Sequence, residues 1–155
     1  MRRYRDELNA PHRVCIMAAD AARARLFAAG PANSGLHELD TLVNPEARTP
    51  ERKLTSDRPG RKANSSGRGT HSFGERAKPH REAVDSFARR IGQRLRAART
   101  VDRFDRIYLV AEPEVLGMIR RTLDERTRKC VVGEVSKSLT RRSAKTIRAA
   151  LPARL

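Results

Sequence analysis

Tryptophan is absent from this 155-residue sequence, and the large aromatic residues that remain are two tyrosines and four phenylalanines. This scarcity predicts a modest apolar core, because aromatic side chains supply much of the area that domains bury. It also leaves few platforms on which nucleic-acid bases could stack. We therefore expect any nucleic acid to be bound mainly through its phosphates.

Cysteine is also scarce, and Cys15 and Cys130 each lie in a short apolar run rather than in a Cys-x-x-Cys pair. This pattern excludes a disulfide framework and is typical of buried thiols in a reducing compartment. No apolar run approaches the length of a membrane-spanning helix. Residues 1–12 form a charged tail without the apolar segment that a signal peptide needs. We therefore expect a cytoplasmic protein with no membrane contact.

Acidic residues are outnumbered, with 18 Asp and Glu against 34 Lys and Arg, which gives a net charge of +16. This charge is far larger than solubility requires. Arginine also outnumbers lysine, and its planar guanidinium group can bind phosphate through two hydrogen bonds. These features predict a polyanionic partner such as RNA. The alternative is an arginine-rich composition that has no role in binding.

Three short apolar segments in the first third of the chain predict strands at 13–19, 24–30 and 36–44. The connections between them are too short for crossovers, so we expect antiparallel neighbours. A single apolar stripe predicts a helix over residues 80–98, with Pro79 in its first turn.

The last third of the chain predicts two crossover units. A buried strand over 105–112 is followed by a helix that opens at Pro113 and has a basic C-terminal end. We expect another strand over 129–135, with Cys130 inside it, and a short final helix over 143–151.

This order of elements predicts an α/β fold with a mixed five-stranded sheet in the order 3-2-1-4-5, because crossovers between parallel strands are right-handed. That is the arrangement of a ribonuclease-H-like three-layer sandwich. We expect a single domain over 13–152, interrupted at about 45–79 by a long basic loop rich in Gly, Pro and Ser.

Four segments follow one another in the chain: "ADAARARLF" after the first strand, then "LVNPEARTPERKLTSDRPGR", "RFDRIYLVAEPEVLGMIRRTL" and "EVSKSLT". In this combination, over residues 13–152, the sequence resembles the bacterial host attachment protein family. The resemblance implies a role connected with attachment to host cells and leaves the molecular activity undefined.

The family is in turn similar to the middle domain of archaeal and eukaryotic class I release factors, which shares this strand order. In that domain a glycine-rich loop ending in Gly-Gly-Gln reaches the peptidyl-transferase centre of the ribosome. The corresponding stretch here reads Gly67, Arg68, Gly69, Thr70, His71, so the glutamine is missing. The resemblance therefore implies RNA or ribosome contact rather than peptidyl-tRNA hydrolysis.

The stretch "SSGRGTH", residues 65–71, matches neither a P-loop nor a dinucleotide-binding fingerprint, because the required glycines and lysine are missing. Basic residues surround it, and two more precede the last helix. Together they form the predicted RNA-binding set: Arg58, Arg61, Lys62, Arg68, Arg76, Lys78, Arg141 and Arg142. The alternative is a solvated connector, since such compositions are disordered without a partner.

Asp20 and Glu112 follow two strands that we expect to be adjacent and parallel. At such an edge, two carboxylates could hold Mg²⁺ for phosphodiester cleavage. The alternative is that Asp20 caps the following turn or pairs with Arg23 or Arg25, and that Glu112 precedes a helix start, which favours anions. His71 is an acid/base candidate in the glycine-containing loop.

No complete catalytic constellation and no cofactor motif is present in the sequence. The main hypothesis is a non-catalytic domain that contacts RNA or the ribosome. A metal-dependent nuclease or other hydrolase, and an attachment protein that acts indirectly, remain alternatives. The sequence leaves the oligomeric state open.

Overall fold

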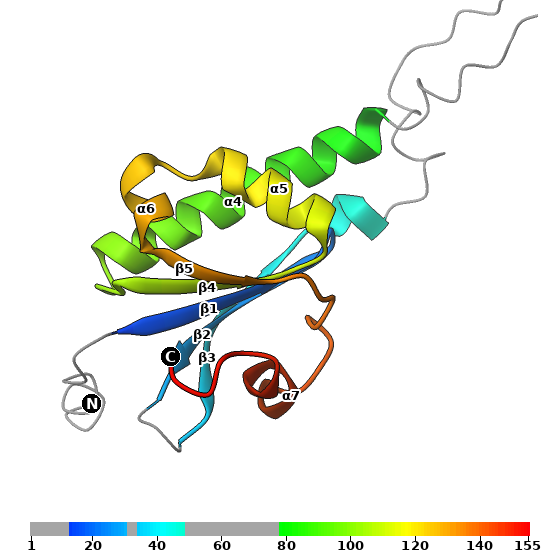
Figure 1. Ribbon diagram of the computed structural model, residues 1–155. Helices are drawn as coiled ribbons and strands as arrows, with labels where there is room; N and C mark the ends of the chain where they lie inside the picture. The colour runs from blue at the N-terminus through cyan, green and yellow to red at the C-terminus, as the bar shows by residue number, and fades with distance from the viewer. Residues whose placement is uncertain (1–12, 31–33, 49–77) are drawn as a thin grey trace, which may run out of the picture.

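The computed structural model describes residues 13–30, 34–48 and 78–155, and these residues contain one mixed sheet (Figure 1). Its strands are β1 (Val14–Ala19), β2 (Arg23–Ala29), β3 (Leu36–Val43), β4 (Arg106–Val110) and β5 (Val131–Val135). The strand order is β3-β2-β1-β4-β5, which confirms the predicted order. As predicted, the pairs β1–β2 and β2–β3 are antiparallel, while β1–β4 and β4–β5 are parallel.

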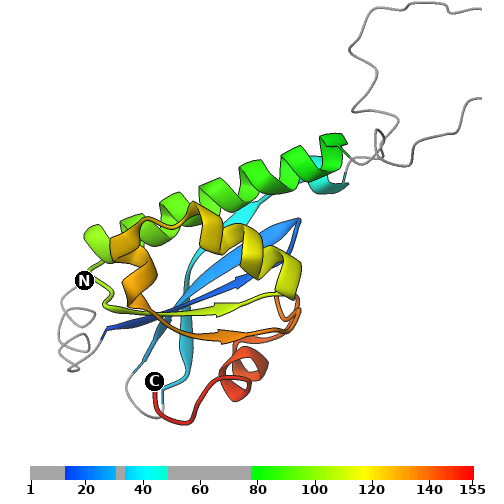
Figure 2. The same cartoon turned by 45° about the horizontal axis from the view of Figure 1, so that its top comes forward.

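Helices cover both faces of this sheet, which gives an α/β fold in three layers (Figures 1 and 2). One face carries α4, α5 and α6, and the opposite face carries α7. The helical elements are η1 (Pro45–Arg48), α4 (Lys78–Thr100), α5 (Pro113–Thr122), α6 (Glu125–Cys130) and α7 (Ala144–Ala149).

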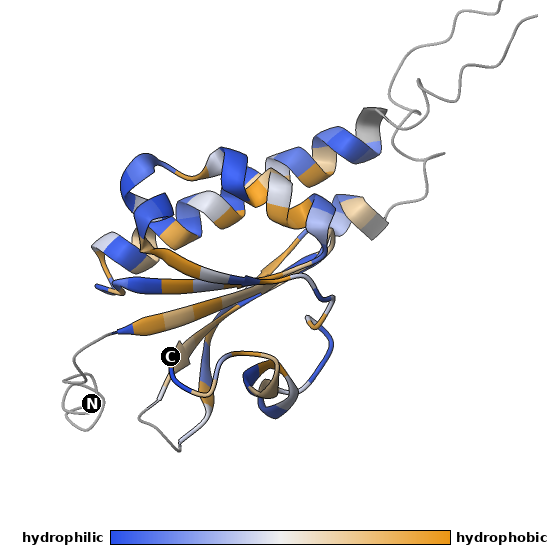
Figure 3. Ribbon diagram, viewed as in Figure 1, coloured by the Kyte–Doolittle hydropathy of each residue, from blue (hydrophilic) through white to orange (hydrophobic). Residues whose placement is uncertain are grey.

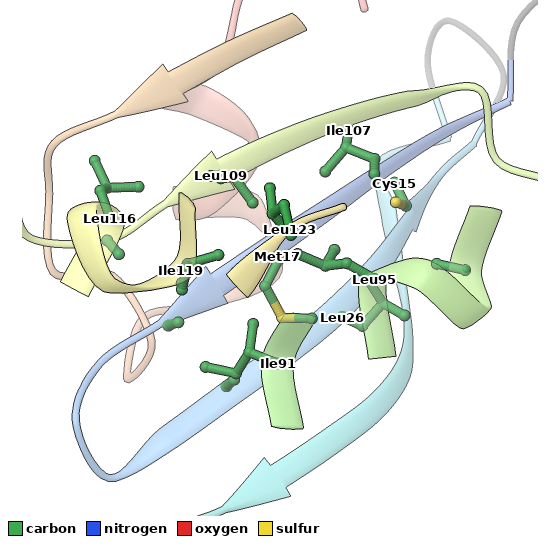
Figure 4. Packing of buried hydrophobic residues seen from close by; sticks show 14 of the residues in the cluster. Cys15, Met17, Leu26, Ile91, Leu95, Ile107, Leu109, Leu116, Ile119 and Leu123 are labelled. Atoms are coloured by element: carbon green, nitrogen blue, oxygen red, sulfur yellow. The ribbon is translucent and has the colours of Figure 1, made fainter. Parts of the chain in front are cut away.

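The larger core lies between the sheet and α4 and α5 (Figure 4). Alternate residues of β1, among them Met17, point to this face and meet Ile91 and Leu95 of α4 and Ile119 of α5. The stripe predicted for α4 is therefore buried, because its apolar residues recur at helical spacing.

A smaller core lies on the other face, where the alternate residues of β1 and β2, including Ile16 and Phe27, pack with Ile147 and Leu151. All six residues of β1 are buried, since this central strand has a core on each side. Apolar residues accordingly gather along the strands and hydrophilic ones on the outward faces of the helices (Figure 3). Within the described ranges, no helix is long and apolar enough to cross a membrane.

The prediction of one helix that opens at Pro113 and runs on to a basic C-terminal end is wrong, because the helix is shorter. It ends at Thr122, Leu123 is extended, and Asp124 begins a second helix by accepting a hydrogen bond from Thr127 N at 2.8 Å. This capping residue starts a new helix instead of continuing the old one.

Arg126, Arg128 and Lys129 are the basic residues expected at the end of the helix that opens at Pro113, and they belong to α6. Cys130 is the last residue of α6, and strand β5 begins at Val131. The prediction that Cys130 lies inside a strand is therefore wrong.

Candidate functional site

The loop of residues 136–142 connects β5 to α7 and lies beside the turn that follows β1. It borders a hollow of about 300 Å³ lined by Asp20, Ser138, Thr140, Arg141 and Arg142. The structure thus brings Asp20 together with two of the predicted RNA-binding arginines, although they are far apart in the sequence. We refer to residues 136–142 as the edge loop.

Asp20 fastens the edge loop to the turn after β1. Its Oδ1 accepts hydrogen bonds from Ala22 N and Arg23 N, both at 2.7 Å. Its Oδ2 accepts a hydrogen bond from the hydroxyl of Thr140, a residue that is buried. Oδ1 therefore caps the turn after β1, as in the turn-capping alternative, and Oδ2 ties the Thr140 side chain to this turn.

Replacing Asp20 with alanine should destabilise the fold by about 1–3 kcal/mol, because the buried Thr140 hydroxyl and two backbone N–H groups lose their acceptor. Urea denaturation measures this difference. Glu114, an exposed carboxylate on α5, provides the matched control as Glu114→Ala. Equal stability of the two variants would contradict the supporting role of Asp20.

Arg25 holds the edge loop from the neighbouring strand β2. Its Nη1 donates to Thr140 O at 3.0 Å and to Arg142 O at 2.8 Å. Its Nε and Nη2 donate to the two carboxylate oxygens of Glu38 on β3, at 3.0 and 2.7 Å. The guanidinium also lies 4.8 Å from the centre of the Phe27 ring. Arg25 therefore fixes the position of the loop relative to the sheet.

Glu38 is strongly acidic as a result. The hydrogen bonds from Arg25 lower the pKa of its carboxyl to about 2, although partial burial opposes this effect. Thr41 adds a hydrogen bond from its hydroxyl at 2.6 Å. Arg25 and Glu38 therefore both carry their charges at neutral pH.

The hollow presents mainly hydrogen-bond donors. Arg142 N donates to Leu139 O within the edge loop and Lys137 N donates to Val135 O at the end of β5, whereas the N–H groups of residues 138–141 have no acceptor in the described part of the chain. The exposed Ser138 contributes a hydroxyl, and the exposed Arg141 and Arg142 contribute guanidinium groups without ion pairs among the described residues. Free N–H groups beside cationic side chains suit an oxyanion such as a phosphate.

Glu112 lies in a different hollow from Asp20. It follows β4 and precedes α5, where its side chain makes no capping hydrogen bond. Together with His80, Arg81 and Glu114 it lines a space of about 230 Å³ between the starts of α4 and α5. Within residues 13–30, 34–48 and 78–155, no three His, Cys, Asp or Glu side chains are grouped so that they could hold a metal ion. Strands β1 and β4 are adjacent and parallel as predicted, but Asp20 and Glu112 line different hollows.

The family model described as "Protein required for attachment to host cells" matches residues 15–151. The chain belongs to this family. No curated protein matches the chain. The family match includes every residue of the edge loop, together with Asp20 and Arg25.

Most of the predicted RNA-binding residues of this host attachment family protein lie outside the described residues. Lys78 is the first residue of α4. The residues of the predicted loop that lie outside the description are Arg58, Arg61, Lys62, Gly67, Arg68, Gly69, Thr70, His71 and Arg76.

Three residues of the candidate site in this host attachment family protein were not predicted from the sequence to belong to it. Ser138 and Thr140 lie in the segment "SKSLT", which carried no local motif for anion binding. The contact of Arg25 with Thr140 spans 115 residues, so no spacing rule could have revealed it.

Proposed function

We propose that this host attachment family protein is a non-catalytic RNA-binding protein whose edge loop contacts phosphate groups. The observation that carries the proposal is the hollow lined by Ser138, Thr140 and two arginines without ion pairs among the described residues, in a loop whose N–H groups at 138–141 have no acceptor there. The supporting contacts of Asp20 and Arg25 hold these donors in place before a ligand arrives. A preformed site loses less conformational entropy on binding.

RNA is the partner that the charge favours. A net charge of +16 provides long-range attraction to a polyanion, and arginine is the residue best suited to phosphate. The scarcity of aromatic residues argues against extensive base stacking. Binding should therefore depend weakly on sequence, with ribosomal RNA as the abundant partner to which the release-factor resemblance points.

The same proposal includes a ribonuclease-H-like, release-factor-like architecture and a cytoplasmic location. The three layers and the strand order support the first. Two free thiols support the second, because Cys15 and Cys130 are both unpaired, as is usual in a reducing compartment. The glycine-containing segment within residues 49–77 would extend the RNA contact.

Removing the two arginines of the hollow should weaken RNA binding. We expect Arg141→Gln combined with Arg142→Gln to reduce affinity for a fluorescein-labelled unstructured RNA by about tenfold, since each lost guanidinium removes a charge-assisted contact. Fluorescence anisotropy at physiological salt measures the affinity.

The matched control removes two charges from α6, as Arg126→Gln combined with Lys129→Gln, and should retain most of the affinity. Both control residues are exposed. Equal losses in the two double variants would show that only net charge matters and would contradict a site at the edge loop. Co-sedimentation of the same proteins with ribosomes separates ribosome contact from binding to RNA in general.

A further inference from the structure

Strand β5 forms an edge of the sheet. It pairs with β4, and no other described strand lies beside it. Val135 O accepts a hydrogen bond from Ala111 N, so Val135 directs its backbone groups toward β4. Since successive residues of a strand alternate in this respect, Glu134 directs its N–H and C=O groups away from the sheet. Val132 has no partner in β4, because the register of the two strands shifts there.

This edge carries a register irregularity at Val132 and the charged residue Glu134, both of which discourage strand addition, but other protection is lacking. It contains no proline or lysine, and Val132 is 48% exposed. Unpaired backbone groups beside an exposed apolar side chain form a template on which another extended segment can pair. The peptide groups of such a segment would continue the sheet as a sixth strand.

Beside β5 lies a hollow of about 440 Å³ with an apolar floor and a basic rim. Leu123 and Val131 supply the apolar part, and Arg120, Arg121 and Arg128 supply the cations. This surface is separate from the edge loop.

The basic rim carries positive charge that the carboxylates of the described residues do not neutralise. Arg120 is paired with Glu134 through its Nε at 2.8 Å. Arg128 donates to the carbonyls of Arg120 and Leu123 at the end of α5, both at 3.3 Å. Arg121 is exposed and has no ion pair within the described ranges. Three arginines against one glutamate leave the rim positive.

The charges beside β5 indicate which kind of extended segment can pair with this strand. A second copy pairing through its own β5 would bring two arginine rims together in a chain that already carries +16. The other sheet edge of a second copy, β3, carries Glu38 and Asp40, but their charges are already paired with Arg25 and Arg94. Neither edge of this chain supplies the free carboxylates that the rim would attract.

We propose that β5 is a docking edge for an extended acidic segment of another protein, which pairs with the backbone groups of Val132 and Glu134 and places carboxylates against Arg121 and Arg128. Main-chain hydrogen bonds provide the affinity, and alternate side chains provide the selectivity. The apolar floor accepts aliphatic residues between the acidic ones. The proposal is independent of RNA binding at the edge loop.

The test uses the full chain and a short peptide of alternating Glu and Val. Two control peptides carry Lys in place of Glu, or N-methyl groups on alternate backbone amides. The methyl groups remove strand hydrogen bonding and leave the charge unchanged. Fluorescence anisotropy measures affinity, and hydrogen exchange followed by NMR reports protection of the Val132 and Glu134 amides.

We expect the acidic peptide to bind and to protect the Val132 and Glu134 amides, and the lysine and N-methylated peptides to bind at least about tenfold more weakly. Arg121→Glu should reduce affinity by a similar factor. Arg89→Glu, the same charge change on the exposed surface of α4, should have little effect.

Three results would overturn the proposal. Equal binding of the N-methylated and unmodified peptides would indicate charge attraction alone. Equal effects of Arg121→Glu and Arg89→Glu would indicate attraction by the charge of the whole surface. Protection of the Val132 and Glu134 amides by RNA or by self-association, and not by the peptide, would assign the edge to that other occupant.

Discussion

The variant Phe27→Ala should lose about 3–5 kcal/mol of folding free energy, the range for truncating a buried phenylalanine. Phe27 is fully buried on the α7 face of the sheet, in the cluster that contains Ile16 and Ile147. Its ring also lies beneath the guanidinium of Arg25. The cavity should therefore weaken both the smaller core and the support of the edge loop.

Chemical denaturation measures this loss, with Phe27→Leu as the conservative control and Val43→Ala as a control at an exposed strand position. Val43 is 41% exposed. Phe27→Leu should retain most of the stability, because it fills much of the same volume. A loss in Phe27→Ala no greater than that in Val43→Ala would contradict the packing of β2 against α7.

The variant Arg25→Met should reduce RNA affinity by about tenfold, because the loop carbonyls of Thr140 and Arg142 lose the donor that holds them in place. Arg25 is a positioning residue in this account and does not contact phosphate itself. Glu38→Gln keeps the contacts of Arg25 with the loop and should bind RNA nearly as well as the unmodified protein. Anisotropy with the same labelled RNA distinguishes the two variants.

Arg25→Met should also change the acid stability. The pKa of Glu38 is lowered from 4.5 to about 2 in the folded protein. The folded state therefore binds fewer protons than the unfolded state between these values. The contribution of the Glu38 carboxylate to the free energy of unfolding is fully present above pH 4.5 and is lost as the pH falls toward 2. This part of the acid dependence should be missing in Glu38→Gln and strongly reduced in Arg25→Met, where only the weaker contributions of Thr41 and Arg23 remain. Its undiminished persistence in Arg25→Met would contradict the Arg25–Glu38 pairing.

The sheet topology was predictable because three short-loop strands and two right-handed crossovers allow few arrangements. The break between α5 and α6 was not predicted, although a local signal existed. Asp124 is a preferred N-cap residue, but the apolar stripe that ends at Leu123 does not show where one helix stops and the next begins.

The candidate site was predictable only in part. Arg141 and Arg142 stood out by charge, and Asp20 by its place at the end of a strand. The interactions that join them depend on side chains that meet across the fold, such as Asp20 with Thr140 and Arg25 with Glu38. Likewise, the strand order placed Asp20 and Glu112 at one edge, whereas the packing of α4 and α5 sets Glu112 among different neighbours.

The salt dependence of RNA binding tests the central claim most directly. The dissociation constant is measured over a series of salt concentrations for the unmodified protein, for the Arg141→Gln and Arg142→Gln double variant, and for the α6 control. If the two arginines each neutralise one phosphate of single-stranded RNA, the log–log slope of the double variant should be shallower by about 1.4. The control should keep the slope of the unmodified protein. Equal slopes for all three proteins would contradict phosphate binding at the edge loop.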